Sequence, residues 1–501
     1  MRYLVKPEQC CRNSPVSVSV LTVVSLVLFL YGWVAVPLAE SAGALRKNPA
    51  NLRYFTDDSG KSIYLTGSHT WGNFQDNGTS DPPPTFNYSA YLDWLQARNH
   101  NFFRLWSWEE SKWTNEIASG YYIQPNIYIR TGSSTALDGK PKFNLTQFNQ
   151  GYFDRLRQRI VLAGQKNIYV AIVLFNGWSV DHPKGNFGSN NPWKGHPYNS
   201  NNNINGVTGD FNGDSSGDET HTLVLPAITT LQKAYVEKVI DTVNDLDNVL
   251  YEISNESNSN SQDWQYAMIL HIKSYEANKA KQHPIGMTVE WPNGSNGDLF
   301  NSPADWVSPN GDVNAPSTAT GNKIVILDTD HVCGVCGDRS WVWKSFTRGN
   351  NPIFMDVYDG AAVGMGASGL NPNEPAFVSA RLNMGYTRTY ASKMNLNAMI
   401  PRPDLASTGY CLANPAASGA EYLVYFPSGG AATVNLSSAQ GSLAVEWFNP
   451  ASGSTLLGGS VAGGRVRTVT APFSNDAVLY LKDNTETVPP DQPATLHSIF
   501  P

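Results

Sequence analysis

The stretch Asn248-Val-Leu-Tyr-Glu-Ile-Ser-Asn255-Glu256-Ser257 is a short apolar strand that stops at an Asn-Glu pair. A carboxylic acid at the tip of a buried strand is costly unless it has a partner or a chemical task. In an eight-stranded α/β barrel the chemistry takes place at these carboxyl-terminal tips, so Glu256 is a candidate proton donor. The alternative is a helix start, with Asn255 or Ser257 as the cap and Glu256 in the first turn. The rest of the chain has to decide between the two.

Apolar runs alternate with amphipathic stretches over residues 45–410, which is the pattern of βα units. The run at residues 167–175 is continuously apolar, as expected of a parallel strand buried on both faces. The predicted strands are residues 62–66, 101–106, 167–175, 249–253, 283–289, 305–308, 323–327 and 352–355, and the predicted helices are 88–98, 153–165, 227–246 and 262–281. This alternation predicts a (βα)8 TIM barrel. The aperiodic residues 177–218 are expected to form a loop over its mouth.

The two ends of the chain differ from the barrel. Residues 1–44 combine basic residues, a long uncharged run and a cluster of small residues, which predicts a signal peptide or a membrane anchor. Export, to the extracellular space or the cell envelope, is therefore expected. Residues 411–483 contain short strands between Gly-, Ser- and Pro-rich turns and predict a small antiparallel β-sandwich. Residues 484–501 have the composition of a flexible tail.

The composition favours a carbohydrate partner. A net charge of −7 gives no basic footprint for nucleic acid, and a charged content of 15% suits an exported protein with an uncharged substrate. The chain has 14 Trp and 23 Tyr, whose rings suit sugar faces, although most buried aromatic residues belong to the core. The sequence carries no signal for an oligomeric state.

Cofactor motifs are missing from the sequence. Cys333-Gly-Val-Cys336 has no second CxxC pair and no histidines at ligand spacing, so it is a local disulfide or a pair of free thiols rather than a metal site. There is also no HExxH, no Gly-rich phosphate loop and no GxSxG. We therefore expect neither a metal nor another cofactor.

Acidic residues recur at the predicted strand tips: Glu256, Glu290, Asp328, Asp330 and Asp356. Cleavage of a glycosidic bond needs two carboxyl groups, one to protonate the leaving oxygen and one to act as nucleophile or base. Several acids in one barrel mouth would also push their pKa values apart, as these two roles require. Any single acid here has a structural alternative, as a helix cap or as a partner of Arg104. A purely structural role for all five is not expected.

Other polar and aromatic residues lie near the same tips. An arginine inside a buried strand, such as Arg104, is rarely unpaired and suits holding a carboxylate ionised, although a structural ion pair remains the alternative. The predicted substrate-binding residues are His69, Trp71, Arg104, Trp106, Trp178, Asn255, Glu290, Trp291, His331 and Asp356.

At these residues the chain resembles clan A glycoside hydrolases, whose (βα)8 barrel carries an Asn-Glu pair at the end of strand four and an arginine on strand two. More closely, it resembles the apiosidase-like family of glycoside hydrolases, exported bacterial proteins with a C-terminal domain of the collagen-binding type. The motifs that carry the resemblance are Thr66-Gly-Ser-His-Thr-Trp71, Asn101-Phe-Phe-Arg-Leu-Trp106, Leu327-Asp-Thr-Asp-His331, Trp341-Val-Trp-Lys344, Pro352-Ile-Phe-Met-Asp-Val-Tyr-Asp-Gly360, Tyr422-Leu-Val-Tyr and Val445-Glu-Trp-Phe-Asn-Pro450.

The resemblance implies a two-carboxylate, retaining hydrolysis of a plant or microbial polysaccharide. Glu256 would be the acid/base and a strand-seven carboxylate the nucleophile. The clan has Glu at that place, whereas this chain offers Asp328 and Asp330, which are two residues apart and can face the same side. Asp328, the first residue past the apolar strand, is the preferred candidate, and Glu290 is the reserve candidate.

A second hypothesis is a non-catalytic surface protein that binds carbohydrate or collagen through a degenerate barrel and its sandwich. A barrel that had lost catalysis would be expected to have lost one of the two carboxylates. This chain keeps Glu256 and two aspartates on strand seven, which favours the enzyme.

Overall fold

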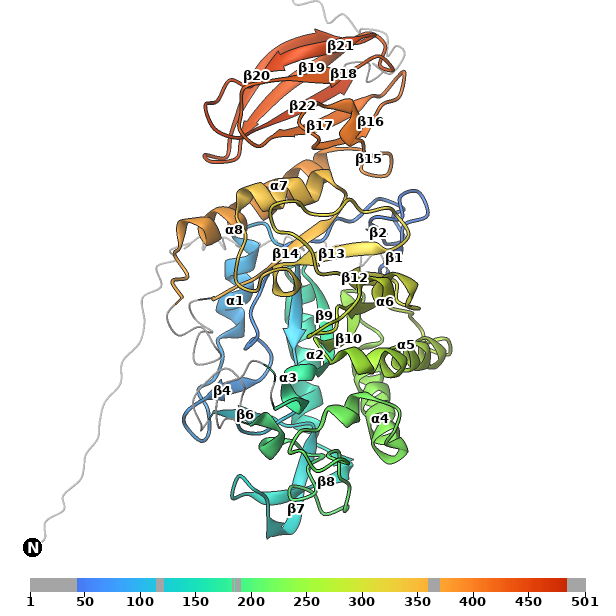
Figure 1. Ribbon diagram of the computed structural model, residues 1–501, viewed down its shortest axis with the longest axis vertical. Coiled ribbons are helices and arrows are strands. Elements are labelled where there is room, and N and C mark those ends of the chain that lie inside the picture. The colour runs from blue at the N-terminus through green and yellow to red at the C-terminus, as the bar shows by residue number, and fades with distance from the viewer. Residues whose placement is uncertain (1–42, 114–120, 183, 185–190, 359–369, 484–501) are drawn as a thin grey trace, which may run out of the picture. The chain divides into compact units, whose positions relative to one another are not determined.

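The computed structural model describes residues 43–113, 121–182, 184, 191–358 and 370–483. Its main sheet has eight strands in the order β3-β14-β13-β12-β11-β10-β9-β5, and every hydrogen-bonded pair is parallel (Figure 1). At the seam between β3 and β5, the Asn101 amide donates to the Thr66 carbonyl at 3.0 Å. The predicted TIM barrel is therefore confirmed, and it is almost closed. The strands are β3 (Gly67–His69), β5 (Phe102–Trp106), β9 (Tyr169–Asn176), β10 (Val249–Asn255), β11 (Ile285–Thr288), β12 (Trp306–Ser308), β13 (Ile324–Asp328) and β14 (Asn351–Met355).

The first strand is the one that lies outside its predicted range of residues 62–66. Strand β3 begins at Gly67, while Ile63 pairs with Phe55 in an isolated antiparallel bridge. Tyr64 and Leu65 are buried all the same, so the apolar pattern extends past the residues that enter the barrel. Phe55 itself belongs to a small ribbon of β1 (Arg46–Lys47) and β2 (Phe55–Thr56).

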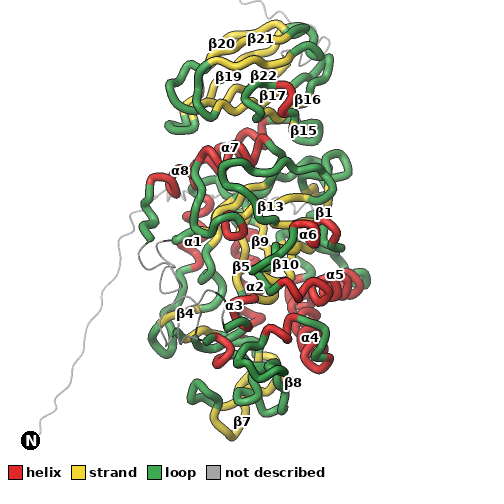
Figure 2. The backbone as a smooth tube through the Cα atoms, viewed as in Figure 1, coloured by secondary structure: helices red, strands yellow, loops and turns green. Residues whose placement is uncertain are grey.

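The four predicted helices are all present (Figure 2). In α4, for example, Tyr235, Val239 and Val243 recur at four-residue spacing and are all buried. The α1 and α2 helices begin after asparagine caps, Asn87 and Asn149, whose side chains accept backbone amide hydrogen bonds. The helices are α1 (Tyr88–Gln96), α2 (Gln150–Gly164), α3 (Gly177–Val180), α4 (Pro226–Val243), α5 (Gln262–Glu276), α6 (Asn296–Asn301), α7 (Arg339–Thr347) and α8 (Pro375–Lys393).

The barrel interior is apolar at one level and polar at the next. One buried cluster joins side chains of β5, β9, β10, β12, β13 and β14, among them Phe102, Leu250 and Trp306, with Leu45 and Phe55. Side chains of so many strands can meet only inside the barrel. Gly286 of β11 makes room for the Trp306 ring, since a Cβ atom there would lie 2.0 Å from it. The charged residues described below follow this layer along the same strands, towards their carboxyl ends.

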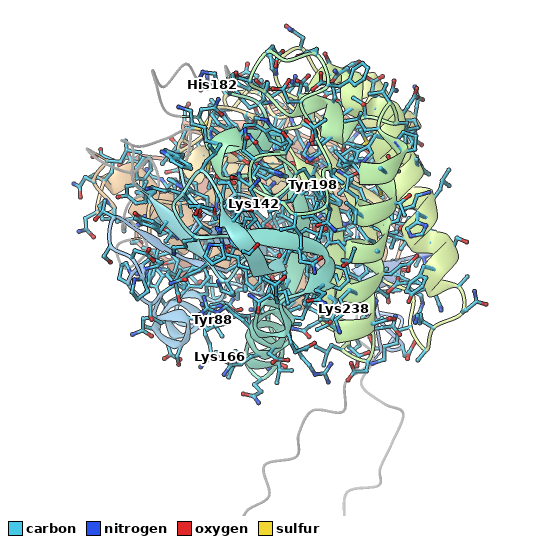
Figure 3. All side chains as sticks on the ribbon, turned by 90° about the horizontal axis from the view of Figure 1, so that it is seen from below. Tyr88, Lys142, Lys166, His182, Tyr198 and Lys238 are labelled. Atoms are coloured by element: carbon cyan, nitrogen blue, oxygen red, sulfur yellow. A yellow bond between two sulfur atoms is a disulfide. The ribbon has the colours of Figure 1, made fainter. Side chains whose placement is uncertain are left out.

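Two long insertions follow β5 and β9 at the carboxyl ends of the strands. The first contains β6 (Tyr122–Gln124), which pairs with β4 (Asp76–Gly78), and the hairpin of β7 (Tyr128–Thr135) and β8 (Pro141–Phe148), which was not predicted. The second is the predicted long loop, and it pairs with this hairpin through two backbone hydrogen bonds of Phe143. Figure 3 looks onto this end, with Lys142 of β8 and Tyr198 of the loop labelled.

The C-terminal domain is the predicted antiparallel β-sandwich. A six-stranded sheet has the order β15-β16-β17-β22-β19-β20, and a two-stranded sheet of β18 and β21 lies across a shared apolar core. The domain begins at Ile400, before the predicted boundary at residue 411, and β16 and β20 were not predicted. The strands are β15 (Ile400–Pro401), β16 (Cys411–Asn414), β17 (Glu421–Phe426), β18 (Ala431–Asn435), β19 (Ser442–Asn449), β20 (Ser454–Ala462), β21 (Val466–Thr470) and β22 (Ala477–Asp483).

The predicted signal or anchor, apart from its last two residues, and the predicted tail lie outside the described residues. Within the part of the chain that the structure describes, no helix is long and apolar enough to cross a membrane. Cys333 and Cys336 form a disulfide, so of the two alternatives for this motif, a disulfide or two free thiols, the disulfide is the one present. Cys411 is a buried free thiol.

Candidate active site

Glu256 lies directly after β10, at the mouth of the barrel. The helix-cap interpretation of this tip is wrong, because α5 begins only at Gln262. Glu256 has a φ of 47°, in the left-handed region that non-glycine residues seldom adopt and that often marks functional sites. Its carboxyl group accepts a hydrogen bond of 2.6 Å from the indole nitrogen of Trp178. Gly177 is required beside it, since a Cβ atom there would lie 2.2 Å from the Glu256 carbonyl oxygen.

Lys184 fixes the backbone of the same turn. Its ammonium group donates to the Glu256 carbonyl at 2.7 Å, to Asn258 Oδ1 at 2.8 Å and to the Trp291 carbonyl. An ammonium group has three N–H donors, so each of them is used. Lys184 thus joins the loop after β9 to the tips of β10 and β11.

The surroundings of Glu256 favour its protonated form. Burial and the nearby Asp330 carboxylate raise its pKa to about 8, against the smaller opposing effects of Trp178 and Lys184. A carboxyl group with this pKa still carries its proton at neutral pH. That is the property required of a general acid.

Arg104 of β5 occupies the centre of the barrel mouth. It forms a two-pronged ion pair with Glu252 of β10, at 2.8 Å from Nε and 2.5 Å from Nη2. Its other three N–H groups donate to Asp328 at 2.9 Å, Asp330 at 2.8 Å and Asn255 at 2.7 Å. A guanidinium has five N–H donors, so none is left over. Sequence reasoning did not single out Glu252, although an acid within the apolar run of β10 was a usable signal.

Asp328 is wholly enclosed by partners. His69 lies 2.8 Å from its carboxylate and Arg104 lies 2.9 Å from it. The Trp106 indole donates to Nδ1 of His69 at 2.9 Å, so the imidazole must present its Nε2 proton to Asp328. Burial opposes the charge on Asp328, but His69 and Arg104 outweigh it and hold the pKa well below its usual value. The Asp328 side chain also caps the amide of Asp330 at 3.0 Å.

A cavity of about 320 Å³ opens between the tips of β10, β11 and β13. Three carboxyl-bearing residues line it, Glu256, Glu290 and Asp330, and Asp328 is not among the lining residues. Asp330, in the 3-10 turn (Thr329–His331) that follows β13, therefore shares the cavity with Glu256. At its rim the Trp178 and Trp291 rings stack, with centroids 5.5 Å apart and planes 9° from parallel.

Glu290 and His331 complete the lining that sequence reasoning had predicted. Glu290 is 2% exposed, and neither of its carboxyl oxygens has a hydrogen-bond partner among the described residues. Burial raises its pKa to about 7. His331 lies 2.7 Å from Ser308 Oγ through Nδ1, and burial lowers its pKa to about 4. His331 is therefore neutral at pH 7.

Seven of the ten predicted substrate-binding residues are not among the lining residues of this cavity: His69, Trp71, Arg104, Trp106, Trp178, Asn255 and Asp356. Three of them are engaged elsewhere. Trp71 is buried, and its carbonyl oxygen accepts from the Trp108 indole at 2.6 Å. Trp106 is buried against His69, with ring centroids 5.7 Å apart. Asp356 forms a buried two-pronged ion pair with Arg381 of α8, at 2.7 and 2.5 Å. The chain past β14 turns this carboxylate towards α8, which a strand-tip position in the sequence does not reveal.

A second buried acid lies behind the turn that carries Glu256. The Glu109 carboxylate is 3.3 Å from His196 and 3.4 Å from His221, and it accepts from the Asn176 amide at 3.0 Å. Burial opposes its charge, but the two histidines lower its pKa to about 2. His221 in turn lies 2.9 Å from Ser257 Oγ. This cluster was not predicted, because its members come from separate loops.

Among the residues that the structure describes, no group of three or more His, Cys, Asp or Glu side chains has the geometry to hold a metal ion. A family model described as "Domain of unknown function (DUF6298)" matches residues 87–291, and one described as "Putative collagen-binding domain of a collagenase" matches residues 400–482. No match was found among curated proteins.

Solved structures of similar fold include glycoside hydrolases. One titled "Glycoside hydrolase" is 13% identical with a TM-score of 0.56, over 89% of this chain and 98% of that one. A glycoside hydrolase family 5 protein from Bacteroides vulgatus is 14% identical with a TM-score of 0.54, over 88% and 94%. A further glycoside hydrolase from that organism, titled "putative", is 13% identical with a TM-score of 0.53, over 89% and 83%. The predicted resemblance to clan A glycoside hydrolases, with a C-terminal domain of the collagen-binding type, is confirmed at the level of the fold.

Proposed function

We propose that this chain is an exported glycoside hydrolase that cleaves O-glycosidic bonds of a plant or microbial polysaccharide with retention of configuration. One observation carries the proposal: a protonated carboxyl group, Glu256, and an ion-paired carboxylate, Asp330, line the same cavity. Glycoside hydrolysis requires this pair of roles. The stacked Trp178 and Trp291 rings supply an apolar surface of the kind that sugar rings bind.

In the first step, Glu256 gives its proton to the glycosidic oxygen while a carboxylate oxygen of Asp330 attacks the anomeric carbon. The bond to the leaving group breaks, and a glycosyl ester of Asp330 forms. In the second step, the Glu256 carboxylate takes a proton from water, whose oxygen attacks the anomeric carbon and releases Asp330. Each residue returns to its starting state, and two inversions give net retention.

Arg104 and Trp178 position the two acids. The guanidinium donates to Asp330 at 2.8 Å and so holds its side chain in place, and the indole orients the Glu256 carboxyl group through a 2.6 Å hydrogen bond. Of the two strand-seven aspartates, we therefore assign the nucleophile to Asp330. Asp328, enclosed by His69 and Arg104, supports the site from below.

The proposal is tested with a panel of aryl glycosides and polysaccharide fragments, on the wild type beside Glu256→Gln and Asp330→Asn. Turnover by the wild type that falls at least 1,000-fold in both variants is the expected result, with the first-formed anomer identified by proton NMR as the retained one. Equal turnover in the wild type and Glu256→Gln would overturn the assignment. If the first product had the inverted configuration, Asp330 would act as a general base and not as a nucleophile.

A second candidate function is binding of carbohydrate or collagen without catalysis. It rests on the match of residues 400–482 to a domain described as collagen-binding. Saturable binding of collagen or glycan by the wild type, together with no turnover on any glycoside, would favour this alternative.

A further inference from the structure

We infer that the cavity takes an uncharged sugar residue and rejects uronic acids, with Glu290 hydrogen-bonded to a ring hydroxyl group. The inference rests on the proposed function and narrows its substrate class. It begins from a carboxyl group that is 2% exposed, lines the cavity and has no partner among the described residues. A buried polar group without a partner is costly, and a ligand that supplies the missing hydrogen bond removes that cost.

Among the described residues, the cavity offers no cation to a carboxylate ligand. Its lining residues include three acids, Glu256, Glu290 and Asp330, and neither Lys nor Arg. A carboxylate brought into this space would lose its water and gain no cation, which is the costly form of burying a charge. The ionised fraction of the three acids adds repulsion.

The two cations next to the cavity cannot compensate. The five N–H groups of Arg104 donate to Glu252, Asp328, Asp330 and Asn255. The three N–H groups of Lys184 are equally occupied. A substrate carboxylate could reach either cation only by breaking one of these bonds, so neither side chain serves as an anion site.

A hydroxyl group, in contrast, fits both states of Glu290. The protonated carboxyl group can donate to a hydroxyl oxygen or accept from its proton, and the carboxylate can still accept. The charged and titratable groups that face Glu290 are Glu256, Asp330 and His331 across the cavity, Asp298 of α6 and Tyr266 of α5. None of these described groups is a Lys or Arg cation, and burial raises the pKa of Glu290 to about 7. Glu290 is therefore half protonated at pH 7 and largely protonated under more acidic conditions, in the form that both donates and accepts.

The experiment compares matched pairs of 4-nitrophenyl glycosides: glucoside with glucuronide, and galactoside with galacturonide. The wild type, Glu290→Gln and Asp298→Asn are assayed, the last as a control that removes a nearby acid outside the cavity. For any pair that is turned over, we expect the wild type to favour the neutral member at least tenfold in kcat/KM. Glu290→Gln, whose amide also donates and accepts but carries no charge, should reduce this preference, while Asp298→Asn should keep it.

A uronide hydrolysed as well as its neutral partner, or an unchanged preference in Glu290→Gln, would overturn the inference. Binding of free galactose and galacturonate by the wild type, measured by saturation-transfer NMR, separates it from the proposed function. Binding of the neutral sugar alone, with no turnover of any glycoside, would contradict the proposed function and support the inference. Binding of the uronate with equal or higher affinity, or of neither sugar, would overturn the inference.

Discussion

Replacing Arg104 by methionine should destabilise the barrel by about 3–5 kcal/mol at pH 7, the usual cost of removing one partner from a buried ion pair. The variant loses five hydrogen bonds, and Glu252 and Asp328, both 0% exposed, lose their shared counter-ion. Asp328 keeps His69. Glu252 keeps no charged partner, and burial already raises its pKa in the wild type.

The size of this effect should depend on pH, since Glu252 can escape its unpaired charge by taking up a proton. Protonating a carboxyl group with an ordinary pKa near 4.5 costs about 3.4 kcal/mol at pH 7 and about 0.7 kcal/mol at pH 5. In Arg104→Met the folded state therefore binds a proton that the unfolded state releases, and the stability of the variant falls as pH rises. The penalty should be about 2–3 kcal/mol smaller at pH 5 than at pH 7.

The assay is urea unfolding of four proteins at both pH values: wild type, Arg104→Met, Glu252→Met and the double variant. The double variant should recover much of the loss, because an apolar pair of similar volume avoids the unpaired charge. Arg157→Met is the control, since its pair with Asp245 is exposed at 43% and 62% and should contribute at most about 1 kcal/mol. A loss below about 1 kcal/mol for Arg104→Met, strict additivity in the double variant, or a penalty independent of pH would refute the reasoning.

Three further predictions concern catalysis. Activity should fall as pH rises through about 8, because Glu256 must be protonated to act as an acid and its pKa lies there; a kcat/KM profile that is flat to pH 9 would contradict this. Lys184→Met should lower kcat at least tenfold and move that basic limb to higher pH, because the lysine charge lowers the pKa of Glu256; Lys184→Arg, which keeps the charge, should leave the limb in place. Asp330→Asn should abolish turnover with little change in melting temperature, whereas Asp328→Asn, which weakens the His69 and Arg104 contacts, should lower the melting temperature by several degrees; the reverse pattern would return the nucleophile to Asp328.

The barrel could be predicted from the sequence, because the pattern of an apolar strand run is repeated along the chain. Seven of the eight strands overlap their predicted ranges, since a strand buried on both faces is a continuous apolar run that few other elements imitate. The first strand was displaced because Tyr64 and Leu65 are buried without belonging to it. The β7–β8 hairpin was missed for the opposite reason: most of its residues are exposed or half-buried, and its apolar alternation is limited to Phe143 and Leu145 of β8.

For the candidate site, the sequence located the strand tips but not the direction of each side chain. Glu256, Glu290 and Asp330 line the cavity, while Asp356, an equally good tip residue in the sequence, pairs with Arg381. The choice between Asp328 and Asp330 depends on where β13 ends, because Asp328 is its last residue and Asp330 lies in the 3-10 turn that follows. A period-two pattern continued past the strand makes the two aspartates look alike. The fold places Asp328 among its buried partners His69 and Arg104, and Asp330 at the cavity.

The different roles proposed for Glu256 (proton donor) and Asp330 (nucleophile) follow from the hydrogen bonds that Arg104 makes. Asp330 receives one of its N–H groups, while Glu256 receives none and takes its hydrogen bond from the neutral indole of Trp178. The positive charge is thus fixed on one side of the cavity by Glu252 and Asp328, which hold the guanidinium from below. Glu256, which is buried and faces the Asp330 carboxylate, keeps its proton. In the proposed mechanism, Glu252 and Asp328 thus set the roles of the two cavity acids, because they hold the guanidinium on the Asp330 side.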